Sequence, residues 1–98
     1  MSIHDIASTG GAKSISAIEQ LLCEGVDVNL RTEEQSTPLH SAAEHGQKEV
    51  VELLLQRGAA VNSCNAKQWT PLHFAACYGQ RDVVELLIEH GADVSLVS

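Results

Sequence analysis

The 98-residue sequence is short of aromatic side chains, of cationic side chains and of long apolar runs. Aromatic residues make up 3% of the chain, so Ala, Val, Leu and Ile must fill its core, which suits thin layers that pack closely. Six Lys and Arg stand against thirteen Asp and Glu, for a net charge of −7. Phosphate binding needs clustered basic side chains, so we predict no nucleic-acid partner. Long-range attraction instead favours a protein partner with a basic segment.

Other absences exclude further classes of protein. No apolar run approaches the ~20 residues that cross a bilayer, so we predict no membrane contact. The three cysteines, Cys23, Cys64 and Cys77, are odd in number and irregularly spaced, which argues against a disulfide framework. They have no zinc-type spacing either, and we predict no metal and no cofactor. Because the N-terminus also lacks a signal segment, we expect a cytoplasmic or nuclear protein.

What the chain does contain is a long internal repeat. The tetrapeptide Thr-Pro-Leu-His occurs at residues 37–40 and again at 70–73, which is 33 residues later. The 25 residues that begin at each copy agree at 16 positions. A period of this length indicates one supersecondary unit that is copied and stacked.

Each copy has the signals of two short helices. Thr37 can cap the first helix, Pro38 suits its first position, and Gly46 can end it in the left-handed conformation. The second helix is expected over residues 48–57 in one copy and 81–90 in the other, each followed by glycine. The polar stretches before the two Thr-Pro pairs, residues 28–36 and 61–69, are predicted to be extended turns or hairpins.

The segment before residue 28 resembles a degenerate copy of the same unit. Residues 20–29 match its end, and Ile3, His4 and Ala7 match its first helix if about three residues are inserted in a loop at 11–14. A register without the insertion places Thr9 and Gly10 at two core alanine positions, which packs worse. We therefore predict the insertion, and a capping role for this copy.

The repeated unit resembles the ankyrin repeat. The signatures are TPLHSAA and TPLHFAA, followed by GQKEVVELLLQRGAAVN and GQRDVVELLIEHGADVS. The resemblance implies an all-α solenoid of about three helix–turn–helix repeats with β-hairpin fingers. The expected divisions are a degenerate N-terminal capping repeat at 1–28, repeats at 29–61 and 62–94, and the start of a further finger at 95–98. It also implies a non-enzymatic scaffold that binds a protein partner on the concave face of fingers and first helices.

Two departures from the family pattern affect the fingers. The family usually has glycine at the finger tip, where this chain has Gln35 and Gln68. The family often begins the finger turn with Asp, where this chain has Thr32 and Asn65. We expect altered turn geometry at these tips.

The resemblance also assigns candidate partner-binding positions to the fingers and the groove. They are Glu33, Glu34, Ser36, Glu44, His45, Arg57, Ala66, Lys67, Trp69, Cys77, Tyr78 and His90, with weaker candidates at Ser8, Thr9 and Glu24. Trp and Tyr dominate binding hot spots, so we predict an anchor of Trp69 and Tyr78 flanked by Glu33, Glu34 and Glu44. The alternative is that Trp69 only packs on the adjacent finger.

Three other residues have competing interpretations. His40 and His73 recur with the scaffold, which favours a structural role over a catalytic or metal-binding one, and the resemblance implies that this histidine ties neighbouring fingers together. Asn29, in Asp27-Val28-Asn29, matches the position at which ankyrin-like domains are hydroxylated by an oxygen-dependent asparaginyl hydroxylase. The alternative is an asparagine that only stabilises its turn.

The last copy has no polar outer face, since residues 83–88 are as apolar as residues 50–55. A terminal repeat needs such a face to stay soluble. We therefore predict that the chain is a fragment of a longer array or buries this face against another chain, with possible self-association. A regulatory or targeting segment of a larger enzyme or signalling protein remains the alternative function. An enzyme in its own right lacks any suitably spaced catalytic constellation.

Overall fold

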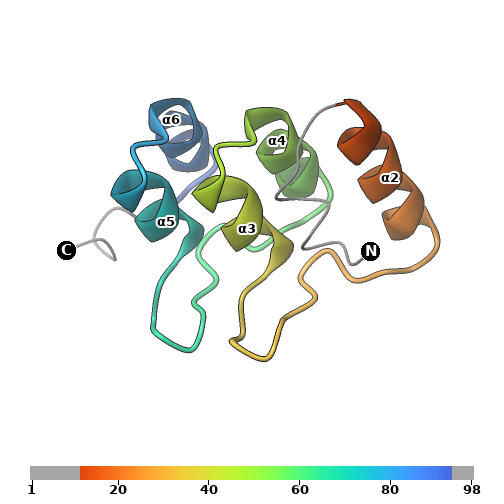
Figure 1. Cartoon of the computed structure of the whole chain (residues 1–98), viewed down its shortest axis with the longest axis horizontal. Helices are drawn as coiled ribbons and strands as arrows, with labels where there is room; N and C mark the ends of the chain where they lie inside the picture. The colour runs from red at the N-terminus through yellow and green to blue at the C-terminus, as the bar shows by residue number, and fades with distance from the viewer. Residues whose placement is uncertain (1–11, 94–98) are drawn as a thin grey trace.

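The computed structural model describes residues 12–93 as a stack of helices with two loops projecting from it (Figure 1). The helices in this part of the chain are α2 (Ala12–Cys23), α3 (Pro38–Glu44), α4 (Lys48–Gln56), α5 (Pro71–Cys77) and α6 (Arg81–Glu89). α3 packs on α4 and α5 packs on α6, which forms one antiparallel helix pair in each copy. The helix limits predicted for the two complete copies are confirmed to within one residue.

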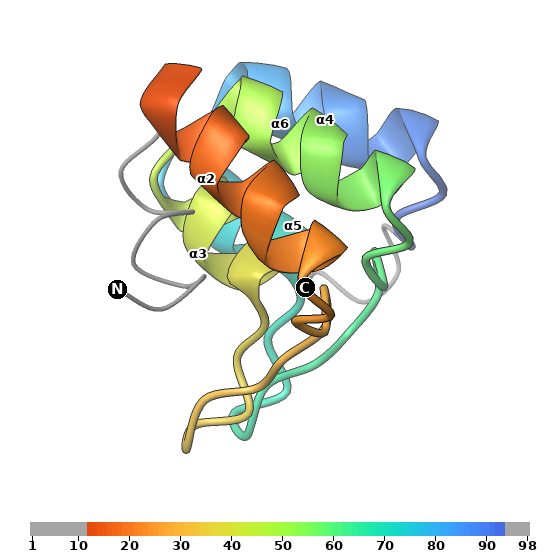
Figure 2. The ribbon, with the colours of Figure 1, turned by 90° about the vertical axis from the view of Figure 1, so that its right-hand side faces the viewer.

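The helix pairs stack side by side in two layers. One layer contains α3 and α5, and the other contains α2, α4 and α6 (Figures 1 and 2). The two loops extend away from the helices as fingers, which Figure 2 shows most clearly. The predicted all-α repeat stack is therefore confirmed. Between residues 12 and 93 no strand is present, so the fingers are hairpin-shaped loops without a regular β-ladder.

The first helices begin with the same local structure. Thr37 and Thr70 are the N-caps of α3 and α5 in extended backbone, and a proline follows each of them. The N–H of Thr70 donates to Nδ1 of His73 (3.0 Å), and the N–H of His73 donates back to the Thr70 hydroxyl (3.3 Å). This reciprocal cap satisfies two N–H groups that the first turn leaves without partners. Gly46 then ends α3 at φ 69°, the left-handed conformation that glycine adopts without strain.

The core lies between the two layers of helices. α4 and α6 contribute half of its buried apolar residues, because their apolar residues recur at helical spacing. The buried apolar residues are Ile18, Leu39, Ala42, Ala43, Val50, Val51, Leu53, Leu54, Leu72, Ala75, Val83, Leu86, Leu87 and Ala92. Small alanines on α3 and α5 let these thin layers approach closely.

The predicted loop at residues 11–14 is wrong for the residues that the structure describes. α2 already begins at Ala12 and runs for 12 residues, against 9 residues in α4 and in α6. No glycine or proline lies within α2 to stop it, so the additional residues extend the helix at its N-terminal end. Ile15 and Ile18 then pack against the core. The candidates Ser8 and Thr9, and the matches at Ile3, His4 and Ala7, lie outside the described residues.

The finger tips keep a left-handed turn despite the absence of glycine. Gln35 and Gln68 both have φ 67°, so the expectation of altered turn geometry is not met. The residues that replace Asp explain how the turns hold. The hydroxyl of Thr32 accepts the N–H groups of Glu34 and Ser36, each at 3.2 Å. The side-chain oxygen of Asn65 likewise accepts two N–H groups of its own turn.

Candidate functional site

The two fingers are named after the repeats to which they lead: the second finger is residues 28–36 and the third finger is residues 61–69. A pocket of about 340 Å³ opens where the third finger meets α5 and the second finger. Its lining residues are Glu34, Asn65, Ala66, Lys67, Trp69, Phe74 and Tyr78. The chain contains one Trp, one Tyr and one Phe, and all three line this pocket. Five of the predicted binding residues are thereby brought together.

Trp69 is held in place from both sides of its backbone. Its N–H donates to Oδ1 of Asn65 (3.0 Å), and its carbonyl accepts from Nε2 of His40 (2.8 Å). The indole lies 5.1 Å from the Phe74 ring and 5.7 Å from the His73 ring, measured between centroids. Trp69 thus packs on the first helix of its own repeat and remains partly exposed toward the pocket. Packing and partner binding are compatible for this side chain.

His40 joins two repeats through one buried imidazole. Its Nδ1 accepts the N–H of Thr37 (3.0 Å), so Nε2 carries the hydrogen that is donated to the Trp69 carbonyl. Desolvation lowers the pKa of His40 below 6.5, and the Arg31 guanidinium lowers it further. The imidazole is therefore neutral in the fold, and it links α3 to the next finger, as the structural interpretation predicts.

Tyr78 lines the pocket at the end of α5, and Glu44 at the end of α3 lies close to it. Tyr78 is the C-cap residue of α5 and is 55% exposed. The Glu44 carboxylate beside it raises the pKa of the phenol above 10.0. His45 is the C-cap residue of α3, and its Nδ1 lies 3.0 Å from the Ser41 carbonyl. Exposed aromatic rings such as Tyr78 are enriched at protein interfaces.

Direct hydrogen bonds hold the two fingers at a fixed separation. The Arg31 guanidinium donates to the carbonyl of Gln35 (2.7 Å) in its own finger and to the carbonyl of Cys64 (2.9 Å) in the next. The N–H of Ala66 donates to the carbonyl of Glu34 (2.9 Å). The wall of the pocket that the fingers form is thus set before any partner arrives.

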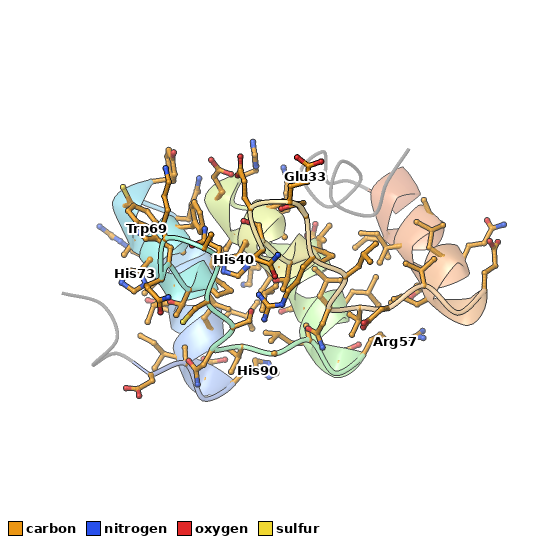
Figure 3. All side chains as sticks on the ribbon, turned by 90° about the horizontal axis from the view of Figure 1, so that it is seen from below. Glu33, His40, Arg57, Trp69, His73 and His90 are labelled. Carbon is orange, nitrogen blue, oxygen red and sulfur yellow. The ribbon has the colours of Figure 1, made fainter. Side chains whose placement is uncertain are left out.

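The other predicted binding residues lie apart from the pocket. Glu33 and Ser36 are on the second finger, with Glu33 exposed. Cys77 is exposed at the end of α5. Arg57 and His90 are the C-cap residues of α4 and α6, and Figure 3 shows them on the side of the stack opposite Trp69. Glu24 follows α2 and accepts a hydrogen bond from Gln20 (3.2 Å). The family resemblance therefore grouped residues from two sides of the molecule.

Two lining residues, Phe74 and Asn65, were not predicted. A signal for Phe74 was present, because position 74 in TPLHFAA corresponds to Ser41 in TPLHSAA. The same comparison of copies that identified Trp69 and Tyr78 would have included it. Asn65 supplies a wall of the pocket while its side chain orders the third finger, and no sequence pattern separates these two roles.

Asn29 bonds to the segment that follows α4, beyond its own turn. Its side-chain oxygen accepts the N–H of Ala60 (2.8 Å), and its amide donates to the Gly58 carbonyl (3.5 Å). Asn62 makes the same pair of bonds to Asp93 (2.8 Å) and Gly91 (3.2 Å). The asparagine therefore has a structural role at both positions. Hydroxylation of Asn29 stays a prediction.

The outer side of the third repeat presents apolar residues to solvent. We define the end face as Ala76, Val84 and Ile88. Ala76 is exposed, Val84 is half-buried, and Ile88 is 46% exposed. Of the equivalent residues in the second repeat, Ala43 and Val51 are fully buried and Leu55 is half-buried.

Over residues 12–93 no helix is long and apolar enough to cross a membrane. In the same residues no three His, Cys, Asp or Glu side chains gather in a way that could hold a metal ion.

The comparisons with known proteins agree with the geometry. The family model for ankyrin repeats (3 copies) matches residues 3–98. The chain belongs to the ankyrin-repeat family. Among solved structures, it is similar to the human ASB11 ankyrin repeat domain, with 32% identity and a TM-score of 0.88. That match covers 100% of this chain and 44% of the other, so this chain spans less than half of that domain. No curated protein matches the sequence.

Proposed function

We propose that this ankyrin-repeat chain binds a protein partner through the face that its fingers and first helices form. Ankyrin repeats are in general protein-binding modules. The observation that carries the proposal is the pocket, because all three aromatic rings of the chain line it together with Glu34. Aromatic side chains bury a large area at a low entropic cost, and they are enriched where interfaces are strongest.

The arrangement favours binding over catalysis. The rings lie on short rigid elements, and Arg31 and Ala66 tie the fingers together. A surface that is ordered beforehand loses little conformational entropy when a partner docks. We propose the cytoplasm or nucleus for this interaction, a proposal that the free thiols of Cys23, Cys64 and Cys77 support.

A capture experiment with matched variants tests the proposal. The chain is immobilised as wild type, as the double variant Trp69→Ala/Tyr78→Ala, and as the double variant Arg57→Ala/His90→Ala. The last pair lies on the opposite side of the stack and serves as the control (Figure 3). We expect the wild type and the control to retain a common protein that the aromatic variant loses, because hot-spot truncations typically cost 2 kcal/mol or more, about thirtyfold in affinity.

Melting temperatures of all three proteins accompany the capture, because Trp69 also packs on Phe74. If the folded aromatic variant retains everything that the wild type retains, this face is not the binding surface. If only the control variant loses the partner, binding occurs on the α4 and α6 side instead.

The end face is a second candidate surface. We propose that protein covers it, either further repeats of a longer chain or another molecule, since Ile88 and Ala76 continue the apolar layer of the stack. A regulatory or targeting role within a larger protein is consistent with this alternative. Sedimentation of the 98-residue chain over a range of concentrations tests it. A strictly monomeric chain with a high melting temperature would count against coverage of this face.

A further inference from the structure

The pocket combines ring faces with a carboxylate, and this combination selects among the side chains that a partner can present. Trp69, Phe74 and Tyr78 supply the rings, and Glu34 lies at the wall that the second finger contributes. Glu44 is close enough to Tyr78 to raise the pKa of its phenol. Among the residues that line the pocket, Lys67 carries the one positive charge. It is exposed, and in the described part of the chain no ion pair joins it to Glu34.

A purely apolar side chain would bury part of Glu34 without giving its carboxylate a partner. Burial of an unpaired charge is unfavourable, so such a ligand would gain from contact with the rings but would be penalised for burying the carboxylate. A cationic side chain with an apolar stem avoids this conflict, because its charge is attracted both to the ring faces and to the carboxylate. The net charge of the whole chain, −7, also attracts a cationic side chain over longer distances.

Of the two strongly basic side chains, arginine fits the pocket better. The guanidinium is planar, so it stacks on an indole while it donates two parallel hydrogen bonds to a carboxylate. It is also more weakly hydrated than an ammonium group, so it loses less when it leaves water for a surface made of three rings.

We propose that this pocket binds an arginine side chain of the partner, with the guanidinium stacked on Trp69 and paired with the carboxylate of Glu34. This inference rests on the proposed function, because it names the chemistry of the partner at the same surface. The bonds from the Ala66 N–H to the Glu34 carbonyl and from Arg31 to the Cys64 carbonyl hold the backbones of the two fingers together, so the two walls of the site are in place without the ligand.

The chain offers a direct reporter, because its only tryptophan lies in the pocket. The probes are blocked pentapeptides with one central residue between alanines: arginine, citrulline, lysine or leucine. Citrulline keeps the shape of arginine and removes the charge. Each peptide is titrated to millimolar concentrations while Trp69 fluorescence and the amide resonances of the third finger are followed. We expect a saturable change with arginine at an affinity about tenfold above that with citrulline, as a charge-assisted bidentate pair would give.

Two variants separate the pocket from the general charge of the protein. Glu34→Gln removes one negative charge at the site and keeps the Trp69 reporter, whereas Glu49→Gln removes one from the exposed start of α4. We expect Glu34→Gln to bring the affinity for the arginine peptide down to that for citrulline, and Glu49→Gln to leave it nearly unchanged. Similar small losses in both variants would show non-specific attraction and overturn the proposal.

The remaining outcomes also decide whether the pocket binds arginine. Equal binding of arginine and citrulline, tighter binding of lysine or leucine, or no saturable change with any peptide would each remove arginine as the ligand. The capture experiment distinguishes this failure from failure of the proposed function. If Trp69→Ala/Tyr78→Ala loses the protein partner while no peptide prefers arginine, the face remains the binding surface and only the arginine assignment falls.

Discussion

The second and third repeats have similar sequences, with 16 of 25 positions identical from the Thr-Pro pair onward, but different surroundings. Ala43 in the second repeat is fully buried, whereas its equivalent Ala76 in the third repeat is exposed. Val51 is also fully buried, and its equivalent Val84 is only half-buried. The same residue at the same helical position is thus core in one copy and surface in the other. In a stacked protein, burial depends on the next repeat as much as on the local pattern.

The two histidines show the same contrast in hydrogen bonding. His40 and His73 both accept an N–H from the capping threonine at 3.0 Å. Only His40 has a following finger among the described residues, and its Nε2 donates to the Trp69 carbonyl there. His73 instead lies beside the Trp69 indole. Each copy therefore caps itself, but the link between repeats needs a neighbour.

The largest effect is expected from a charge placed at the paired alanines. We predict that Ala43→Asp lowers the free energy of unfolding by more than about 3 kcal/mol, because it forces an unpaired carboxylate into a packed layer. Ala76→Asp should change it by no more than about 0.5 kcal/mol, since the residue is exposed. Urea denaturation of both variants measures the difference.

Urea denaturation of the two alanine variants at two protein concentrations shows whether another molecule covers Ala76. If Ala76→Asp costs stability only at the higher one, another copy of the chain covers the end face. Equal and small losses in both variants would show that the third repeat does not pack on the second through Ala43.

A smaller effect is expected at the histidines. His40→Ala should cost about 2–4 kcal/mol, because it leaves both the Thr37 N–H and the Trp69 carbonyl without their partner in a buried place. His73→Ala should cost about 1 kcal/mol, chiefly from its cap. Chemical denaturation at pH 8 provides the measurement. A cost at His73 equal to that at His40 would contradict the role assigned to the bond with Trp69.

The stabilisation that His40 provides should also depend on pH. Its folded pKa lies below the unfolded value of 6.5, so the unfolded chain binds the proton more readily. The contribution is therefore fully present above pH ~6.5 and is lost as the pH falls toward the folded pKa. We expect the gap in unfolding free energy between wild type and His40→Ala to narrow between about pH 8 and about pH 5. A gap of constant size would rule out the neutral buried imidazole.

The smallest effect is expected where the two repeats do not differ. Gln35 and Gln68 occupy the same left-handed conformation, which costs a non-glycine residue roughly 1 kcal/mol. Relief of this strain is offset by about 0.5–1 kcal/mol, because glycine has greater freedom when unfolded, so Gln35→Gly and Gln68→Gly should each stabilise the chain by no more than about 0.5 kcal/mol. Thermal denaturation at one protein concentration can resolve such a gain. Two variants that destabilise instead would show that the tip side chains make contacts worth more than the strain.

The elements that local chemistry specifies could be predicted from the sequence. Thr-Pro pairs and following glycines placed α3 to α6 almost to the residue, because caps and left-handed stops act within one turn of helix. The start of α2 could not be placed in this way, since Ala12 has no cap signal before it and alignment to the other copies suggested a loop. The pocket was predicted only in part. Trp69 and Tyr78 stood out as differences between copies, but their meeting with Phe74 and Glu34 depends on how two fingers and α5 come together.

The bonds between residues about one repeat length apart have a consequence for how the chain folds. His40, Asn29, Arg31 and Gln80 make bonds to residues 29 to 36 positions away. Each of these bonds closes a loop of about one repeat, whatever the length of the array. The entropic cost of closing a loop depends on its length, so every added repeat meets the same modest barrier. We therefore expect folding to start in one helix pair and to spread to its neighbours stepwise, at a rate that does not fall steeply as repeats are added.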